Sequence, residues 1–326
     1  MYGTQFRMQQ RYHFCTIFDY SYLAKALVLM ESLRSVCDCE IYAFTDDQKC
    51  IDALTARSMA YVTIVDLKEI EDENLRMVKS QRDRGEYFWT IKASCILYLF
   101  KRNKMLVVTY VDADTEFFSD PSPLFNQMTI GYSVLLLPHN FSRRYAHEIK
   151  NGIYNAGYIS FKNSEQGIAA LRWWDAKCRE WCFRKIEKHR FGDQLYLNEM
   201  ASFDGVTAID HNGALANWNI QDYTYSFENG KLIASMHGEG KFPIISYHFH
   251  YLRFILPDKV ELGRKYIPEA ILKYVYKPHI QKLLSFMPID DQGTKPNAVS
   301  WKTPIIFILR KISNTYNVYS ISNFVK

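Results

Sequence analysis

The sequence lacks the features that place a protein in or across a membrane. It has no apolar run of the roughly 20 residues that a membrane-spanning helix needs, and its polar first segment, residues 1–11, has no apolar signal-peptide core. It also lacks a Cys-x-x-Cys pair, and its odd number of cysteines argues against a disulfide framework or a zinc site. We therefore expect a cytoplasmic protein whose cysteines are small buried side chains. The seven cysteines are Cys15, Cys37, Cys39, Cys50, Cys95, Cys178 and Cys182.

Length and composition limit the fold class and the partners. A chain of 326 residues suffices for one large α/β domain with an appendage, or for two modest domains. The aromatic share of 15% fits sugar-stacking surfaces as well as an aromatic core. The net charge of +5 is concentrated in residues 255–326, where eleven Lys and Arg stand against five Asp and Glu. This excess indicates an anionic surface as partner, and because the chain has no recognised nucleic-acid-binding motif we expect no nucleic acid.

Short apolar runs alternate with stretches of helical spacing along the chain. Such alternation is typical of an α/β protein with a mostly parallel sheet and helices on both of its faces. We found no internal repeat. Strands are predicted at residues 12–18, 41–44, 61–65, 105–111, 132–137, 154–161 and 205–209, with a strand pair around 231–249. Helices are predicted at residues 22–33, 48–58, 68–80, 87–101, 165–188 (after a Ser164 cap), 191–200, 267–286 and 302–313, and residues 211–230 are expected to form an irregular loop.

Two carboxylates follow the predicted buried strand at residues 105–111. Asp112 and Asp114 stand one residue apart directly after it, and Glu116 comes next. Ligands of open parallel sheets bind just past the carboxyl ends of the strands, and adjacent carboxylates repel each other unless a cation or a donor-rich ligand lies between them. Mg²⁺ and Mn²⁺ take such oxygen ligands together with phosphate oxygens. The pair therefore indicates a metal–diphosphate site; the alternative is that both residues serve an ordinary turn or helix cap.

Two further candidates stand in the first hundred residues. Residues 16–21 follow the first predicted strand and suit contact with a base or ribose, although Asp19 is equally suited to cap a helix. Lys92 is a lone cation among apolar neighbours on a predicted helix. It either extends to solvent or neutralises a diphosphate at the metal site.

The remaining candidates lie after residue 150. Asn155 and the pair Asp193-Gln194 are polar groups in apolar elements, and such groups suit recognition of sugar hydroxyls. Gly157 interrupts a predicted strand, which often marks a close approach by a ligand or another backbone. His248 and His250 are expected on one face of a strand, where an imidazole is either an ordinary core residue or a nitrogen ligand for Mn²⁺ beside two carboxylates.

Six segments stand in an order that resembles a known family. They are FCTIFDYSYLAKALVLMESL, WTIKA, YVDADTEFF, NAGYISF, GDQLYLN and SYHFH. Together they resemble the GT-A glycosyltransferases, and are most similar to the retaining group that includes glycogenin and the bacterial lipopolysaccharide galactosyl- and glucosyltransferases. The resemblance covers roughly residues 12–251 and implies the Rossmann-like GT-A sheet.

The resemblance implies an activity as well as a fold. It implies a metal-dependent glycosyltransferase that moves a hexose from a nucleotide-diphosphate sugar to a hydroxyl of a glycan or glycolipid, with retention, in lipopolysaccharide or capsule assembly. The site residues that it implies are Asp112, Asp114 and His248 for Mn²⁺ (or Mg²⁺), Thr16, Asp19, Ser21, Asp112 and Ala113 for the nucleotide, and Lys92, Asn155, Asp193 and Gln194 around the phosphates and the donor sugar.

The chain also departs from the family pattern. The family often follows its late histidine with Gly and then Lys-Pro-Trp, which contacts the diphosphate; here His250 is followed by Tyr251, Leu252 and Arg253, so Arg253 is a candidate to replace the lysine. The acidic-Asn-Tyr that follows the family's first strand is also changed, which leaves the nucleotide open. Two alternatives remain: a nucleotidyltransferase, which would ordinarily need a Gly-rich basic loop that residues 18–21 do not supply, and a non-catalytic carbohydrate-binding protein.

We expect two parts in the chain. Residues 1–254 form the catalytic domain, and residues 255–326 form a basic, aromatic and mainly helical extension. Apolar residues alternate there with basic ones as in an interfacial helix, so we expect either peripheral contact with the anionic inner face of the plasma membrane or packing back onto the domain. The residues concerned are Trp301, Lys302, Ile305, Ile306, Phe307, Ile308, Leu309, Arg310 and Lys311.

Overall fold

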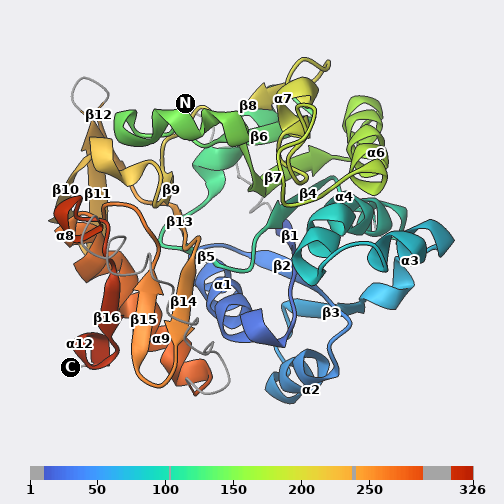
Figure 1. Cartoon of the computed structure of the whole chain (residues 1–326). Helices are drawn as coiled ribbons and strands as arrows, with labels where there is room; N and C mark the ends of the chain where they lie inside the picture. Colours follow the sequence, from blue (N-terminus) through green and yellow to red (C-terminus); the bar gives the residue numbers. More distant parts are fainter. Residues whose placement is uncertain (1–10, 103, 237–239, 289–309, 326) are drawn as a thin grey trace, which may run out of the picture.

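A seven-stranded sheet forms the centre of the molecule (Figure 1). The computed structural model describes residues 11–102, 104–236, 240–288 and 310–325. The strand order is β3-β2-β1-β4-β7-β6-β8, and every neighbouring pair is parallel except those that β7 makes with β4 and β6. The mostly parallel α/β sheet predicted from the sequence is therefore confirmed. Its strands are β1 (Tyr12–Ile17), β2 (Cys39–Thr45), β3 (Val62–Asp66), β4 (Val107–Val111), β6 (Val134–Pro138), β7 (Tyr154–Lys162) and β8 (Val206–Ala208).

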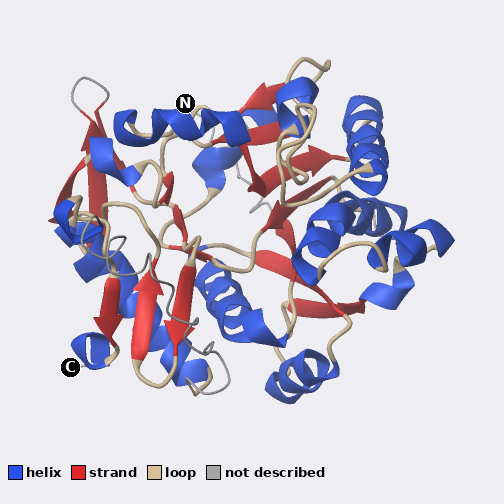
Figure 2. Cartoon of the chain, viewed as in Figure 1, coloured by secondary structure: helices blue, strands red, loops and turns tan. Residues whose placement is uncertain are grey.

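Helices cover both faces of this sheet (Figure 2). Because side chains alternate along a strand, Phe14 of β1 enters the core packed by α1, whereas Cys15 enters the core packed by α4 and α6. The cysteines of the described residues are free, and most of them are buried, as expected. The helices are α1 (Leu23–Val36), α2 (Gln48–Arg57), α3 (Glu73–Lys79), α4 (Arg84–Arg102), α5 (Asn126–Thr129), α6 (Glu165–Glu180), α7 (Tyr196–Met200), α8 (Glu269–Ile271), α9 (Lys277–Phe286) and α12 (Ser322–Val325), with short 3₁₀ turns η1 (Tyr20–Tyr22), η2 (Leu67–Glu69), η3 (Ser122–Phe125), η4 (Arg143–Asn151) and η5 (Ile220–Asp222), and a π-helical segment η6 (Leu272–Tyr276).

Polar side chains fix where several helices begin. Asp47 and Asp72 accept hydrogen bonds from the backbone amides that open α2 and α3, as N-cap residues do. Ser164 caps α6 as predicted, with its hydroxyl accepting from the Gly167 amide. The helix is shorter than predicted, because Trp181 adopts an extended conformation and ends it at Glu180.

Three small sheets complete the fold, and the sequence did not predict most of their strands. The segment 211–230, expected to be an irregular loop, contains β9 and β10. The sheets have the orders β5-β13-β9, β10-β11-β12 and β14-β15-β16. Their strands are β5 (Thr115–Phe117), β9 (Ala214–Ala216), β10 (Thr224–Glu228), β11 (Lys231–Met236), β12 (Gly240–Pro243), β13 (Ser246–His248), β14 (Leu252–Ile255), β15 (Lys259–Leu262) and β16 (Val318–Ser320).

The described part of the C-terminal extension packs back onto the main body. Its helix α9 lies against α1, and its strand β15 pairs with both β14 and β16 (Figure 1). The extension therefore contains strands as well as the expected helices. Most of the predicted helix at 302–313, with its apolar residues from Trp301 to Leu309, lies outside the described residues. Within the described part, none of the helices is both long and apolar enough to span a membrane.

Candidate metal and donor site

Asp112, Asp114 and His248 come together just past the carboxyl end of β4. One ligand atom from each of the three lies within 4.8 Å of the other two. His248 Nε2 is 3.0 Å from Asp114 Oδ1 and 3.9 Å from Asp112 Oδ2. This is the only such group of His, Cys, Asp or Glu among the residues that the structure describes. Two carboxylate oxygens and an imidazole nitrogen suit a cation such as Mn²⁺.

Strand pairing brings the histidine to the carboxylates across more than 130 residues of sequence. In the β5–β13 pair, His248 lies opposite Thr115, the residue directly after Asp114. The amide of Phe249 then donates to the carbonyl of Asp114 at 2.8 Å. The backbone on either side of the ligands is therefore hydrogen-bonded, and the ligand positions are set before any cation binds.

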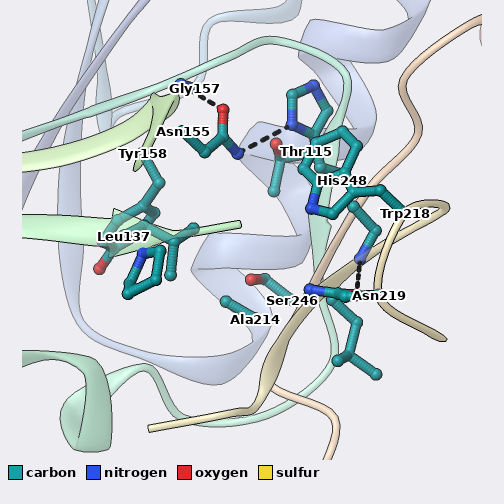
Figure 3. A pocket seen from close by; sticks show the side chains of 13 residues that line it. Thr115, Leu137, Asn155, Gly157, Tyr158, Ala214, Trp218, Asn219, Ser246 and His248 are labelled. Atoms are coloured by element: carbon teal, nitrogen blue, oxygen red, sulfur yellow. Dashed lines mark hydrogen bonds between the residues drawn. The ribbon is translucent and has the colours of Figure 1, made fainter. Parts of the chain in front are cut away.

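Asn155 and Gly157 of β7 lie beside His248, the third member of the Asp112–Asp114–His248 triad (Figure 3). Asn155 accepts from the Gly157 amide at 2.8 Å through Oδ1, and its Nδ2 lies 3.4 Å from His248 Nδ1. With Nδ1 facing the amide group, Nε2 is the nitrogen presented to the carboxylates. Gly157 lies so close that a Cβ built on it would be 2.5 Å from Asp112 Oδ2. The sequence led us to expect a ligand or another backbone close to this glycine, whereas the nearest atoms are those of side chains of the site.

Lys92 of α4 is buried beside the triad and joins two acids. Its Nζ lies 3.2 Å from Asp112 Oδ1 and 3.0 Å from Asp193 Oδ2. It also donates to the carbonyl of Ala156 at 3.1 Å, with the ring of Tyr110 4.6 Å away. The Tyr110 hydroxyl in turn donates to Asp112 Oδ1 at 2.9 Å. Lys92 thus pairs with one carboxylate of the candidate metal site and one further acid, and does not extend to solvent.

Burial and neighbouring charge act against each other on the ionisable groups of this site. Burial on its own would lower the pKa of Lys92, but Asp112 and Asp193 raise it above its ordinary value. Burial raises the pKa of Asp193 despite the adjacent ammonium. Asp114 is buried as well, yet His248 holds the pKa of its carboxyl well below the usual range, and Asp114 raises that of His248 against the effect of burial. A proton on His248 and a metal cation therefore compete for the same place.

The side chains of the predicted sugar-binding pair, Asp193 and Gln194, have different partners. Asp193 is buried, and its Oδ2 has no hydrogen-bond partner among the described residues apart from the ion pair with Lys92. The Gln194 side chain donates to the carbonyl of Asn151 at 2.9 Å. Only Asp193 therefore belongs to the charged cluster around Lys92.

The residues expected near the nucleotide lie at the end of β1 and in the turn between the two acids. Asp19 caps η1 by accepting from Ser21, from the amide at 3.1 Å and from the hydroxyl at 2.6 Å. Its other oxygen lies 3.6 Å from Nε of Arg84. Thr16 is buried, and its hydroxyl has no hydrogen-bond partner among the described residues. Ala113 is buried between Asp112 and Asp114.

Two expectations about the segment after His248 are wrong. His250 does not share a strand face with His248, because β13 ends at His248. The two rings lie 5.7 Å apart, and burial lowers the pKa of His250 to about 4. Arg253 forms an ion pair with Glu261 through Nε at 2.9 Å and Nη2 at 2.6 Å. It is therefore paired with a carboxylate of the extension and not free to replace the missing lysine.

His248 and Trp218 line a small cavity together with residues of β6, β7 and β9 (Figure 3). Its volume of about 10 Å³ is enough for about one water molecule. Thr115 and Ser246 supply hydroxyl groups to its lining. A cavity of this size accommodates neither a nucleotide nor a sugar.

Comparison with known proteins identifies the family. No protein-family model matches the chain. The uncharacterized protein YfnF of Bacillus subtilis (strain 168) is 31% identical over 259 residues, which cover 76% of this chain and 84% of YfnF. The chain belongs to the YfnF family. The uncharacterized protein YfnD of the same organism is 29% identical over 281 residues, which cover 83% of this YfnF-family chain and 88% of YfnD.

Among solved structures, this YfnF-family chain is similar to the galactosyltransferase LgtC in complex with donor and acceptor sugar analogs. The TM-score is 0.55 at 12% identity, with 91% of this chain and 99% of the LgtC chain covered. At this level of identity the likeness establishes the fold. The GT-A fold predicted from the sequence is therefore confirmed for this member of the YfnF family.

Three residues close to the candidate site of this YfnF-family chain were not identified from the sequence. Tyr110 stands two positions before Asp112 and shares its side of the strand, so period-two spacing would have indicated it. Tyr22 and Lys25 lie at the start of α1. Both carboxylates of the triad raise the pKa of Tyr22, and burial lowers the pKa of Lys25 while Asp114 opposes that effect. Asp114 is the largest of the influences that raise the pKa of the Tyr22 phenol. No spacing rule relates residues 22–25 to a carboxylate pair 90 positions later.

Proposed function

We propose that this protein is a metal-dependent glycosyltransferase that moves a hexose from a nucleotide-diphosphate sugar to a hydroxyl of a glycan or glycolipid. The observation that supports this most is the Asp112–Asp114–His248 triad at the carboxyl end of a central strand. A metal-bound diphosphate at this position would lie where α/β sheets bind their ligands. The GT-A fold supports the same proposal at the level of fold analogy.

The donor set fits a divalent cation. Two carboxylates and a neutral imidazole supply hard oxygen and borderline nitrogen ligands, which suit Mn²⁺ and, with less preference for the nitrogen, Mg²⁺. Asp112 and Asp114 are the oxygen ligands of the proposal, and His248 Nε2 is its nitrogen ligand. When bound, the cation would neutralise negative charge on the diphosphate leaving group.

The chain's own residues would position the reacting groups. The Lys92 ammonium holds Asp112 and Asp193 in fixed places and adds positive charge at the site. Asp193 would lie beside the anomeric carbon, where its carboxylate stabilises positive charge that develops on the sugar ring. Retention would follow either from attack on the leaving-group side or from a covalent intermediate at Asp193. Thr16, Asp19, Ser21 and Ala113 would contact the nucleotide, and Asn155 and Gln194 the donor sugar.

We also propose a setting for the reaction. Transfer to a lipopolysaccharide or capsule acceptor at the inner face of the plasma membrane would use the basic extension to approach an anionic surface. The net charge of residues 255–326 supports this proposal. Nucleic acid is not proposed as a partner.

The change Asp114→Asn tests the proposal. We expect wild-type protein to release a nucleoside diphosphate from one of a panel of nucleotide-sugars in the presence of Mn²⁺, and the variant to be slower by on the order of 100-fold. The panel is first screened by thermal shift with and without Mn²⁺, because a bound ligand raises apparent stability. Asp204→Asn, at an exposed acid, is the matched control. Full Mn²⁺-dependent turnover in Asp114→Asn would remove the metal from the proposal.

The same preparations separate the two alternatives. A nucleotidyltransferase would release pyrophosphate from a nucleoside triphosphate and a hexose 1-phosphate. A non-catalytic binding protein would show a thermal shift with a nucleotide-sugar but release no nucleoside diphosphate with any acceptor.

A further inference from the structure

The charges of the proposed donor site do not balance once a substrate is bound. Asp112 and Asp114 together neutralise a divalent cation. Lys92 is already paired with Asp112 and Asp193, and His248 is neutral as a metal ligand. The two negative charges of a diphosphate ester then lack a partner. An uncompensated charge in a partly buried site is costly, so the site needs another cation.

Lys25 of α1 is a cation placed to meet this need. Its Nζ donates to the carbonyl of Leu252 at 2.9 Å and lies 4.2 Å from the centre of the Tyr22 ring. Among the described residues no carboxylate lies within ion-pair distance of it, whereas Lys92 has two. An ammonium has three donors, and the one recorded hydrogen bond leaves two of them for a ligand.

The surroundings of Lys25 place it on the Asp114 side of the triad. Lys25 is among the positive charges that lower the pKa of Asp114. Its bonding partner, Leu252, begins β14 four residues after His248. The amide of Leu252 donates to the carbonyl of Phe249, whose own amide donates to Asp114. Lys25 is therefore connected to the turn that presents the histidine ligand, while Lys92 acts from the Asp112 side.

Tyr22 adds a second observation. It precedes Lys25 by three residues, and its side chain is 41% exposed. Asp114 and Asp112 both raise the pKa of its phenol, so its hydroxyl is close to the triad. The start of α1 thus presents a partly exposed tyrosine and an ammonium on the Asp114 side of the triad.

We propose that Lys25 is a further cation of the donor site, besides the metal and Lys92, and that it binds the diphosphate of the nucleotide-sugar. In the transfer, the acceptor hydroxyl oxygen bonds to the anomeric carbon and its proton passes to solvent water, while the bond from that carbon to the diphosphate oxygen breaks and its electron pair passes to that oxygen. The Lys25 ammonium stabilises the negative charge added there. Lys25 is then a catalytic residue that touches the leaving group. This inference rests on the proposed function, since it assigns a residue to the same donor site.

Lys25→Met tests this assignment by removing the charge while keeping most of the side-chain volume. The probes are the diphosphates of uridine, guanosine, adenosine, cytidine and thymidine, titrated by calorimetry with Mn²⁺ present, and Mn²⁺ alone, titrated by electron paramagnetic resonance. We expect the dissociation constant of the tightest-binding diphosphate to rise by about tenfold or more, as for loss of a hydrogen bond to a charged group. The dissociation constant of Mn²⁺ alone should change by less than about threefold, and kcat for the matching nucleotide-sugar should fall.

Controls separate this role from a purely structural one. Lys273 also lies over a tyrosine ring, that of Tyr274 at 4.9 Å, and is exposed in the extension, so Lys273→Met is expected to leave both constants unchanged. Lys25→Arg keeps the charge and should recover part of the lost affinity.

The experiment distinguishes failure of this inference from failure of the proposed function. Unchanged diphosphate affinity in Lys25→Met, with lower stability alone, would assign Lys25 only to holding Leu252 and overturn the inference while leaving the proposed function standing. If wild-type protein bound none of the diphosphates with Mn²⁺, the proposed function and this inference would fall together.

Discussion

Gly157 shows how much of the site depends on the absence of a single side chain. It lies in β7 directly beneath the triad. A Cβ at this position would lie 2.5 Å from Asp112 Oδ2, 2.9 Å from His248 Cε1 and 3.0 Å from Asn155 Oδ1. Real side chains essentially never approach so closely, so even a methyl group forces at least one metal ligand to move.

Gly157→Ala is therefore expected to weaken metal binding. Overpacking a buried site costs about 1–3 kcal/mol of stability, and the displaced ligands should raise the dissociation constant of Mn²⁺ by on the order of tenfold. The measurements are urea unfolding and Mn²⁺ titration by electron paramagnetic resonance. Gly230→Ala is the control, because that glycine has φ +78 and no atom within 4 Å of its would-be Cβ, so it strains the backbone without touching the site. Equal Mn²⁺ affinity in both variants would show that the site tolerates the methyl group.

The candidate residues differ in how far the sequence alone could indicate them. Asp112 and Asp114 were found because they follow a buried strand directly, and strand ends are where ligands bind. His248 and Lys92 were equally compatible with ordinary roles, and only the family resemblance connected them with the carboxylates. Lys25 was not found at all, because the partner that orients its ammonium, the Leu252 carbonyl, lies 227 residues away in sequence.

At the scale of elements, α9 connects the two strands that present metal ligands. His279 of α9 is stacked on Phe249, with ring centroids 3.5 Å apart, and its Nδ1 lies 2.7 Å from Glu116 Oε2. Glu116 stands two residues after Asp114, and Phe249 stands one residue after His248. A single buried imidazole therefore contacts one residue near Asp114 and one residue next to His248.

The protonation of this group follows from its burial. Burial lowers the pKa of His279, while Glu116 opposes that effect. Burial alone would raise the pKa of Glu116, but His279 and Lys282 bring it below its ordinary value. We infer a neutral imidazole that donates from Nδ1 to an ionised Glu116, with Lys282 as the charge partner. The unprotonated Nε2 of His279 then needs no acceptor, in agreement with its lack of a hydrogen-bond partner among the described residues.

A double-mutant cycle on His279→Leu and Glu116→Met measures this connection. Either single change is expected to destabilise the protein by about 2–3 kcal/mol, because a hydrogen bond to a buried charge is lost. The double variant should be less destabilised than the sum of the singles, since it leaves neither group unpaired. Unfolding in urea gives the coupling energy, and Mn²⁺ affinity shows whether the ligands have moved. If the losses of stability in the two single variants were strictly additive, His279 and Glu116 would not be coupled, and this would contradict the connection of α9 with the strands β5 and β13.

The elements of the sheet were predictable where burial alone determines them. β1, β2 and β4 are short, largely buried apolar runs, and the sequence located each within a few residues. Strands such as β5, β9 and β13 have three residues each, too few for a periodic pattern, and they form only because distant segments pair with them. Their partners are set by tertiary structure, so single-sequence periodicity does not reveal them.

At the scale of the whole molecule, the extension is part of the folded body as far as it is described. β14 pairs with β15, and residues such as Val260, Ile271 and Ile280 are fully buried in the same core as α1. Arg310, for which membrane contact and packing back onto the domain were both expected as alternatives, lies 3.2 Å from Glu261 and donates to the carbonyl of Gly263. Removal of everything after residue 254 would therefore disrupt the core, and membrane contact is better tested by point substitutions.

The double substitution of Trp301→Ser and Phe307→Ser provides that test. If the segment lies in a membrane interface, burial of its apolar side chains adds to electrostatic attraction by the basic extension. Wild-type protein should then co-sediment with vesicles of phosphatidylglycerol and phosphatidylcholine but not with phosphatidylcholine alone, and the double variant should remain in the supernatant. High salt should also release the wild type, because it screens surface charge. Ile130→Ser, at an apolar residue that is 75% exposed elsewhere on the molecule, is the matched control and should sediment like the wild type. Equal sedimentation of wild type and double variant would show that residues 301–309 make no contribution to membrane contact.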